Sequence, residues 1–327
     1  MVDDPQTQRK LLEILRILSE SKEVMGARRI ASELNRRGYR IGERAVRYHL
    51  RMLDERGFTK KHGYIGRTIT ENGLREIGDA LVGDRIGLVI TKIEDLVYRT
   101  TFDPKSKKGD VIVNTALVDK DKFESTIRII NAVLEKGYGV SSYIKILDEG
   151  DSLNDIIIPK GKVGIATLCS ITIDGILLKS GIPVETKYGG LVKIKENKPA
   201  HFSELIAYAG TSIEPIQIFM SKRLTSITSA ITTGSGMVLG NLREIPAIAL
   251  DRAREVLQAI KESGINGLIA IGRASETVLG APVEAGRVGI AVYAGVNAMA
   301  AVEEQGIPTN TRAISTLLPF KDMNLLS

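Results

Sequence analysis

The sequence predicts an α/β (α+β) protein in which an N-terminal winged helix-turn-helix is followed by a duplicated βαββαβ region. Residues 1–80 contain three helix-like segments and a β-prone hairpin, with 17 Lys and Arg against 12 Asp and Glu, a net charge of +5. Residues 81–327 hold 28 and 27 of these, a net charge of +1, and contain two similar stretches 125 residues apart. We therefore expect two domains, 1–80 and 81–327, the first of which binds a polyanion.

Three helices are expected in the N-terminal domain. Apolar residues recur at helical spacing over residues 7–19, and Pro5 before them suits a helix start. A second helix is expected over residues 27–36, because Gly38 follows it as a C-terminal breaker. After a tight turn, a third helix is expected over residues 43–55.

The third helix has two distinct faces. Val46, Leu50 and Leu53 form an inward stripe. The opposite face carries residues at i, i+3, i+4 and i+7, namely Arg44, Arg47, Tyr48 and Arg51. Such a face suits a helix that lies in the DNA major groove, where arginine pairs with guanine. The alternative is a solvated arginine-rich helix of a three-helix bundle.

A hairpin follows the third helix. The segment FTKKHGYIGRTIT, residues 58–70, has two short β-prone runs around His62-Gly63. A hairpin in this position is the wing of a winged helix, and Lys60, Lys61 and Arg67 are expected near DNA phosphates or the adjacent minor groove. A further helix is expected to begin after Thr70.

The C-terminal region is a tandem repeat. Residues 161–187, GKVGIATLCSITIDGILLKSGIPVETK, align without gaps with residues 286–312, GRVGIAVYAGVNAMAAVEEQGIPTNTR. Nine of the 27 pairs are identical, where about two are expected by chance from ordinary composition. Duplication is the simplest explanation, with copies at about 109–205 and 234–327.

Each copy is expected to fold in the order βαββαβ. In the first copy the elements are expected at residues 110–117, 122–136, 142–147, 163–167, 171–180 and 184–194. In the second they are expected at residues 237–239, 249–263, 268–271, 288–292, 296–305 and 312–317. This order predicts an α/β sandwich whose helices cover one face of each sheet, with the two copies packed around a pseudo-two-fold axis.

Two equivalent turns are candidate anion sites. The turns at residues 167–170 and 292–295 each join a strand end to a helix start, where free N–H groups and the helix dipole favour a carboxylate or phosphate. The candidate contacts in these turns and their helices are Thr167, Cys169, Ser170, Thr172, Gly295 and Asn297. The alternative is that these residues are simply helix N-caps.

Other candidates are weaker. Gly189 and Gly190 are expected in a turn that lets backbone approach a ligand. Arg243 and Arg273 are candidate partners of an acidic ligand, or only surface charges. The sequence offers no convincing set of nucleophile and base, and His201 has no neighbours with metal or catalytic spacing, so we expect no catalytic residue, metal or cofactor.

Cysteine and hydropathy favour a soluble intracellular protein. The single cysteine, Cys169, excludes an internal disulfide and fits a reducing cytoplasm. The N-terminus lacks an apolar signal-peptide core, and the most apolar stretch, 163–182, is interrupted by Asp174, Lys179 and glycines. We expect no association with membranes.

The chain resembles the NrpR family, nitrogen-regulation transcription repressors of methanogenic archaea. The resemblance spans nearly the whole chain, from KLLEILRILSES and RYHLRMLDERG to DEGDSLNDIIIPKGKVGIATLCSITIDGILLKSGIPVETKYGGLVKI and the second repeat. It implies a winged helix with one NrpR effector domain. It also implies repression of nitrogen-assimilation genes and release from the operator by 2-oxoglutarate, a small dianionic keto acid, for which Cys169 and Ser170 are the first candidate contacts.

We expect a homodimer that places two recognition helices on a palindromic double-stranded operator. Since some family members carry two effector domains, a companion protein is expected to supply further ones. Two other functions stay open: a regulator whose effector domain binds a partner protein rather than a small molecule, and a small-acid enzyme with an attached winged helix.

Overall fold

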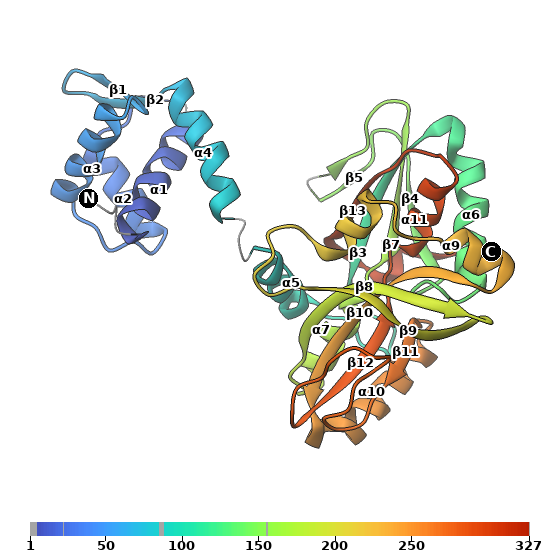
Figure 1. The fold of residues 1–327 in the computed structure, drawn as a ribbon. Coiled ribbons are helices and arrows are strands. Elements are labelled where there is room, and N and C mark those ends of the chain that lie inside the picture. Colours follow the sequence, from blue (N-terminus) through green and yellow to red (C-terminus); the bar gives the residue numbers. More distant parts are fainter. Residues whose placement is uncertain (1–4, 22, 85–87, 155, 327) are drawn as a thin grey trace. The chain divides into compact units, whose positions relative to one another are not determined.

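The chain separates into two compact units, Met1–Ile86 and Gly87–Ser327, called here the N-terminal and C-terminal units. The computed structural model describes residues 5–21, 23–84, 88–154 and 156–326. The expected fold class is confirmed, because the first unit is a winged helix and the second combines two five-stranded antiparallel sheets with helices (Figure 1).

The N-terminal unit has the expected three helices and wing. Its elements are α1 (Pro5–Ser21), α2 (Ala27–Arg36), α3 (Glu43–Glu55), β1 (Thr59–His62), β2 (Gly66–Ile69) and α4 (Glu71–Asp84). Gly38 and Gly57 follow α2 and α3 with φ of +89° and +73°, a conformation that favours glycine and ends both helices. The apolar stripes of α1, α2 and α3 meet in one core that includes Ile14, Leu34 and Leu50.

The C-terminal unit contains both βαββαβ copies. The first copy comprises β3 (Asp110–Asp119), α6 (Phe123–Glu135), β4 (Tyr143–Leu147), β7 (Lys162–Leu168), α7 (Ile171–Lys179) and β8 (Glu185–Lys195). The second comprises β10 (Gly236–Pro246), α10 (Leu250–Glu262), β11 (Leu268–Ile271), β12 (Arg287–Tyr293), α11 (Asn297–Glu304) and β13 (Asn310–Pro319).

The two copies exchange their last strands, which the sequence did not predict. One sheet has the order β13-β3-β7-β4-β14, with β14 at Asn324–Leu325, so the last strand of the second copy pairs with the first strand of the first. The other sheet has the order β11-β12-β10-β8-β9, with β9 at Lys198–Ala207, so β8 pairs with β10. Because each five-stranded sheet needs strands from both copies, neither copy is complete alone.

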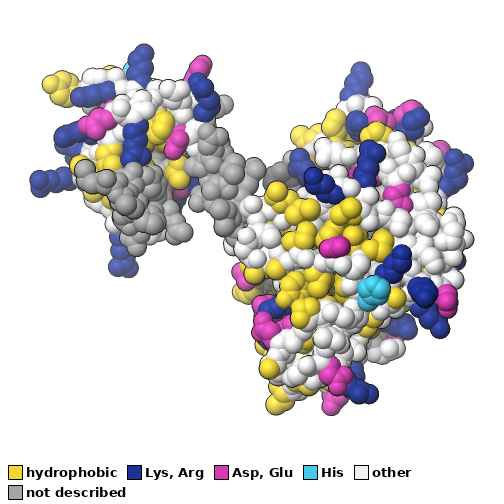
Figure 2. Space-filling model, viewed as in Figure 1, with side chains coloured by type: hydrophobic (Ala, Val, Ile, Leu, Met, Phe, Trp, Pro, Cys, Tyr) yellow, Lys and Arg dark blue, Asp and Glu magenta, His cyan; other side chains and the backbone are white. Residues whose placement is uncertain are grey.

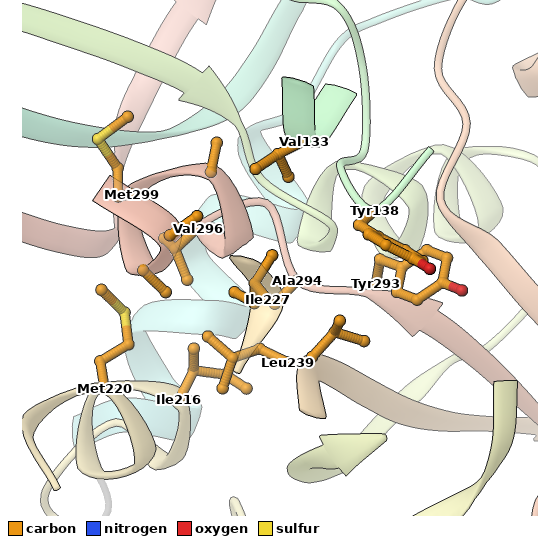
Figure 3. Close-up of a cluster of buried hydrophobic side chains, with 14 of the residues drawn as sticks. Val133, Tyr138, Ile216, Met220, Ile227, Leu239, Tyr293, Ala294, Val296 and Met299 are labelled. Carbon is orange, nitrogen blue, oxygen red and sulfur yellow. The ribbon is translucent and has the colours of Figure 1, made fainter. Parts of the chain in front are cut away.

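Helices from different copies also pack together. Helix α11 packs on α6, and α7 packs on α10 and on α5 (Leu88–Arg99), a helix before the first repeat. Residues 171–177 of α7 and 297–302 of α11 are all buried, which makes these two helices the centre of the unit. Figure 3 shows Met299 of α11 and Val296, the residue before this helix, in one buried cluster with Leu239 of β10.

Several elements have no counterpart in the repeat and were not predicted. These are α5, the small hairpin of β5 (Ser152–Leu153) and β6 (Ile156–Ile157), strands β9 and β14, and the helices α8 (Pro215–Ser221) and α9 (Ile227–Thr233). Helix α9 ends at Gly234, whose φ is +75°, and β10 begins two residues later. Helix α8 packs against β8 and α9 against β10, so both cover the second sheet.

The expected turn at Gly189-Gly190 is wrong. Both glycines lie inside β8, where they pair with Asn241 and Gly240 of β10. A Cβ on Gly190 would lie 2.4 Å from the carbonyl oxygen of Glu204 in β9, and one on Gly189 would lie 2.9 Å from Pro215 of α8. Close packing of the protein's own chain, and no turn, therefore accounts for these glycines.

Candidate functional site

The exposed face of α3 offers free positive charge. Arg44, Arg47, Tyr48 and Arg51 are all exposed, while Val46, Leu50 and Leu53 are buried beneath them. Arg47 donates to Glu43 over 2.6 Å on the same helix, whereas Arg44 and Arg51 form no ion pair with any described residue. Two guanidinium groups on one helix face are thus available to a polyanion.

The wing is a regular antiparallel hairpin in which Lys60 and Lys61 are exposed. Arg67, the third predicted DNA contact here, has a side chain only 16% exposed that lies against Asp54 of α3. Its Nε lies 3.0 and 2.8 Å from the two carboxylate oxygens. We therefore assign Arg67 to holding the wing on α3 and omit it from the DNA contacts. Figure 2 shows Lys and Arg side chains gathered on the side of this unit formed by α3 and the hairpin.

His49 lies on the buried face of α3, and we expect its protonation to destabilise the N-terminal unit. Its side chain is buried with Nδ1 unpartnered, and burial, with a smaller effect of Lys10, lowers its pKa below the usual 6.5. A lowered folded-state pKa means that the free energy of unfolding falls as the pH decreases below 6.5. We expect amide-exchange protection of α3 to be lower at pH 5 than at pH 7.5.

In His49→Gln this pH dependence should be much weaker, because no imidazole must be protonated in the core. The matched control is His62→Gln on the wing, which should keep it, since the His62 ring bonds Thr68 at the edge of the unit. Equal pH dependence in wild type and His49→Gln would refute the role of His49.

In the C-terminal unit, the two predicted helix starts are tied to strands in the same way. Cys169 N–H donates to the carbonyl of Ile112 over 2.8 Å, and Ala294 N–H to that of Leu239 over 2.9 Å. Thr172 Oγ1 accepts from Ile112 N–H (3.0 Å), and Asn297 Oδ1 accepts from Leu239 N–H (2.8 Å). These bonds occupy both side chains, so Thr172 and Asn297 hold the helix starts in place.

The two turns contact each other. Thr167 Oγ1 donates to the carbonyl of Gly295 over 3.1 Å. A Cβ at position 295 would lie 2.1 Å from the carbonyl oxygen of Leu168, so glycine is required where the turns cross. The structure therefore brings Thr167, Cys169, Ser170 and Gly295 together.

Two asparagines at equivalent strand positions complete this cluster, and the sequence reasoning missed both. Asn114 of β3 lies beside Thr167 and accepts from Ile314 N–H (3.1 Å), while Asn241 of β10 donates to Ser170 Oγ (3.1 Å). Each interrupts an apolar strand, in VIVNTALV and VLGNL, and a buried polar residue in such a run is a usable signal.

The polar chain continues from Asn241 to a buried carboxyl group. Tyr208 OH lies 2.9 Å from Asn241 Oδ1 and 2.8 Å from Glu214 Oε1. Glu214 caps α8 by accepting from Gln217 N–H, and burial raises the pKa of its carboxyl. The free space between the two turns and Glu214 is only about 10 Å³, which leaves room for about one water molecule.

Arg243 is buried beside the first turn of α7. Its Nε lies 2.5 Å from Asp174 Oδ1, with both side chains at most 1% exposed, and Thr186 donates to the other carboxylate oxygen. The Nε contact lacks hydrogen-bond geometry, and Nη1 and Nη2 have no partner among the described residues. Burial without full pairing costs several kcal/mol, which makes this guanidinium a candidate ligand contact.

Cys169 and Arg273 offer less than the sequence indicated. Burial raises the pKa of the Cys169 thiol to about 12, so the thiol stays neutral and cannot act as a nucleophile near pH 7. Arg273 is exposed in the segment after β11, and no hydrogen bond or ion pair recorded among the described residues joins it to the cluster.

Ile314 marks strain next to the cluster. Its φ is +49°, rare for a β-branched residue, and it lies in the irregular part of β13 between Arg312 and Thr316. Such strain is often found at ligand sites.

In the described ranges, no group of three or more His, Cys, Asp and Glu side chains could hold a metal ion, and no helix is long and apolar enough to cross a membrane.

A winged helix with free arginines, joined to an α/β domain built around a polar cluster, defines a transcription regulator of the winged-helix class. Residues 86–325 match the family described as NrpR regulatory domains NRD1 and 2. The chain belongs to the NrpR family of nitrogen regulators and is not an enzyme. Residues 12–77 also match the Ribonuclease R winged-helix domain, which supports the winged-helix fold.

Named relatives agree with this. The chain is 51% identical to the Global nitrogen regulator NrpRI of Methanosarcina mazei over 98% of each protein. It is 37% identical to the Global nitrogen regulator NrpR of Methanocaldococcus jannaschii over 97% of this chain, but covers 55% of that longer protein. The crystal structure of a nitrogen repressor-like protein from Methanococcus jannaschii matches with a TM-score of 0.62 and 28% identity, covering 73% of this chain and 98% of that one.

Proposed function

We propose that this protein represses nitrogen-assimilation genes by binding a specific DNA operator, and that 2-oxoglutarate bound in the C-terminal unit releases it. Two observations support the two halves of this proposal. Among the described residues, Arg44 and Arg51 on the exposed face of α3 have no ion-pair partner, and two nitrogens of the buried Arg243 guanidinium have no hydrogen-bond partner.

For DNA, α3 lies in the major groove, where Arg44 and Arg51 pair with base edges or phosphates. The wing lysines Lys60 and Lys61 contact the flanking backbone. Two copies of the chain form a homodimer, so that two α3 helices contact half-sites about one DNA turn apart. A companion protein with further effector domains is an additional partner, since the chain covers only 54% and 55% of two longer relatives.

For the ligand, one carboxylate of 2-oxoglutarate lies at the start of α7, near Ser170, where the helix dipole favours an anion. The Arg243 guanidinium supplies the counter-charge with its two free nitrogens. A cavity of about 10 Å³ is too small for this keto acid, so binding requires Tyr208 and Glu214 to move away from Asn241. The side chain of Glu214 already places a buried carboxyl group next to this space. In the complex, a carboxylate of the ligand replaces the Glu214 carboxyl group at this position.

Movement of the Tyr208–Glu214 segment is the step that connects ligand to DNA. Helix α8 follows Glu214 directly, and Gln217 Nε2 of this helix donates to the carbonyl of Thr311 in β13 (3.0 Å). Displacement of Glu214 therefore pulls on a strand of the second copy that pairs with β3 of the first. Ligand binding shifts the dimer toward an arrangement with the wrong half-site spacing, and does so only by its differential affinity for the two arrangements.

The decisive experiment measures binding of the full chain to DNA from upstream of a nitrogen-assimilation operon, at fixed salt, with and without millimolar 2-oxoglutarate. We expect sequence-specific binding that the keto acid weakens, and no effect of glutarate, which lacks the keto group. Arg273→Ala serves as the matched control and should keep the ligand response, because Arg273 lies in an exposed segment outside the cluster.

Each failure has a distinct meaning. Absence of sequence-specific binding would refute the operator function. Specific binding without any response to 2-oxoglutarate, together with no rise of the melting temperature in its presence, would refute the ligand and favour a unit that binds a partner protein.

A further inference from the structure

The tip of the wing carries two large apolar side chains that contact almost nothing. Tyr64 is 108% and Ile65 76% exposed, relative to the reference value for each residue type. The exposed large apolar residues of the N-terminal unit, among those described, are Tyr48, Tyr64, Ile65 and Leu74. Three of the four therefore lie on α3 and the wing, the surface that also carries the unpaired basic residues.

The base of the wing is held firmly, so the tip is presented in a fixed position. Arg67 and Met25 exchange backbone hydrogen bonds of 3.0 Å each. Arg67 pairs with Asp54 of α3, which also accepts from Thr59 Oγ1 (2.6 Å). A Cβ on Gly66 would lie 2.2 Å from the carbonyl oxygen of Met25, which shows how closely the hairpin base is packed.

The charges beside the tip indicate what it meets. Lys60 and Lys61 of β1 are exposed, and strand β1 leads directly to the tip. A pair of apolar side chains between cationic groups suits the DNA minor groove, where phosphates line both rims and base edges form the floor. An apolar tip alone would also suit a hydrophobic surface of another protein. The adjacent lysines would not, because such a surface offers them no negative charge.

We propose that Tyr64 and Ile65 enter the minor groove next to the operator half-site and act as a wedge that partly unstacks one base step. This inference rests on the proposed operator binding. It adds a contact whose strength depends on how easily the DNA sequence deforms. Pyrimidine–purine steps such as TA and CA unstack most easily. The wedge therefore selects operators with such a step beside each half-site, and bends the duplex there.

The test compares wild type, Tyr64→Ala and Tyr64→Ala/Ile65→Ala as full chains on an operator fragment carrying 2-aminopurine at the flanking step. Wild type should raise the fluorescence of this base, which reports unstacking, and the double variant should not. We expect the double variant to bind about tenfold more weakly with an unchanged salt dependence, because no phosphate contact is lost. Lys60→Ala should instead reduce the slope of log affinity against log salt by about 0.9.

Leu74→Ala, an exposed apolar residue on α4, is the matched control and should change neither affinity nor fluorescence. If wild type binds the operator and the double variant shows the same affinity and the same fluorescence as wild type, the wedge is overturned. The operator function would then remain intact. Normal DNA binding with impaired self-association would assign the tip to a protein contact and overturn it as well. If wild type does not bind the operator specifically, both the operator function and the wedge are overturned.

Discussion

The variant Arg44→Ala/Arg51→Ala is expected to bind operator DNA at least about a hundredfold more weakly than wild type, while its folding is unchanged. Both side chains are exposed on α3 and form no ion pair within the part of the chain that the structure describes, so their removal should cost no ion pair within the protein. One arginine–guanine pair discriminates by about 1–3 kcal/mol, and two such pairs account for this loss. Titration of labelled operator at two or more salt concentrations measures the affinity and its salt dependence.

Arg47→Ala should have a smaller effect than either of these changes. Its guanidinium already bonds Glu43 over 2.6 Å, and moving it to DNA would cost that contact. The matched control is Arg252→Ala/Arg254→Ala on α10, which removes the same charge from exposed positions of the C-terminal unit. If this control lost as much affinity as the α3 variant, the effect would be one of net charge, and α3 would not be the recognition helix.

The N-terminal unit was predictable because its signals are local. The apolar stripes, the glycines at positions 38 and 57, and the β-prone runs each depend on a few neighbouring residues. The helices over 27–36 and 43–55 accordingly have the predicted bounds. The role of Arg67 was not predictable, because its partner Asp54 lies 13 residues away, and neither charge pattern nor spacing distinguishes an ion pair from a DNA contact.

The C-terminal unit shows where sequence reasoning ends. Repetition predicted the order of elements in each copy, but pairing of β8 with β10 and of β13 with β3 is a long-range choice that no local pattern encodes. Strand β9 and helices α8 and α9 lie between the copies, so comparison of the repeats could not find them. This unpredicted segment contains Tyr208 and Glu214, which close the candidate ligand site.

Within the site, the repeat predicted which turns are equivalent, but not that they contact each other or which groups stay free. Thr172 and Asn297 are equivalent residues whose side chains are consumed by backbone bonds. Arg243 is the opposite case, since its guanidinium was predicted as a ligand contact and lies buried with two unpartnered nitrogens. Burial and hydrogen-bond geometry determine whether a side chain is held by backbone bonds or stays free for a ligand. Neither can be known before the chain is folded.

Arg243→Met is therefore expected to destabilise the C-terminal unit strongly, by about 3–5 kcal/mol, because Asp174 is left buried without its counter-charge. Burial already raises the pKa of Asp174 against the effect of Arg243, and removing the guanidinium raises it further. A raised folded-state pKa means that stability is retained at low pH and lost as the pH rises. Urea unfolding should thus find a larger deficit at pH 7.5 than at pH 5.

Asp174→Asn/Arg243→Met separates stability from ligand binding. Since the double variant leaves no buried charge at this pair, it should recover most of the lost stability, and the pH dependence of the deficit should vanish. Its melting temperature should nevertheless not respond to millimolar 2-oxoglutarate, which raises that of wild type and of Arg273→Ala. If 2-oxoglutarate raised the melting temperature of a stable double variant, the ligand would bind without the Arg243 guanidinium. That result would exclude Arg243 as the counter-charge of the ligand.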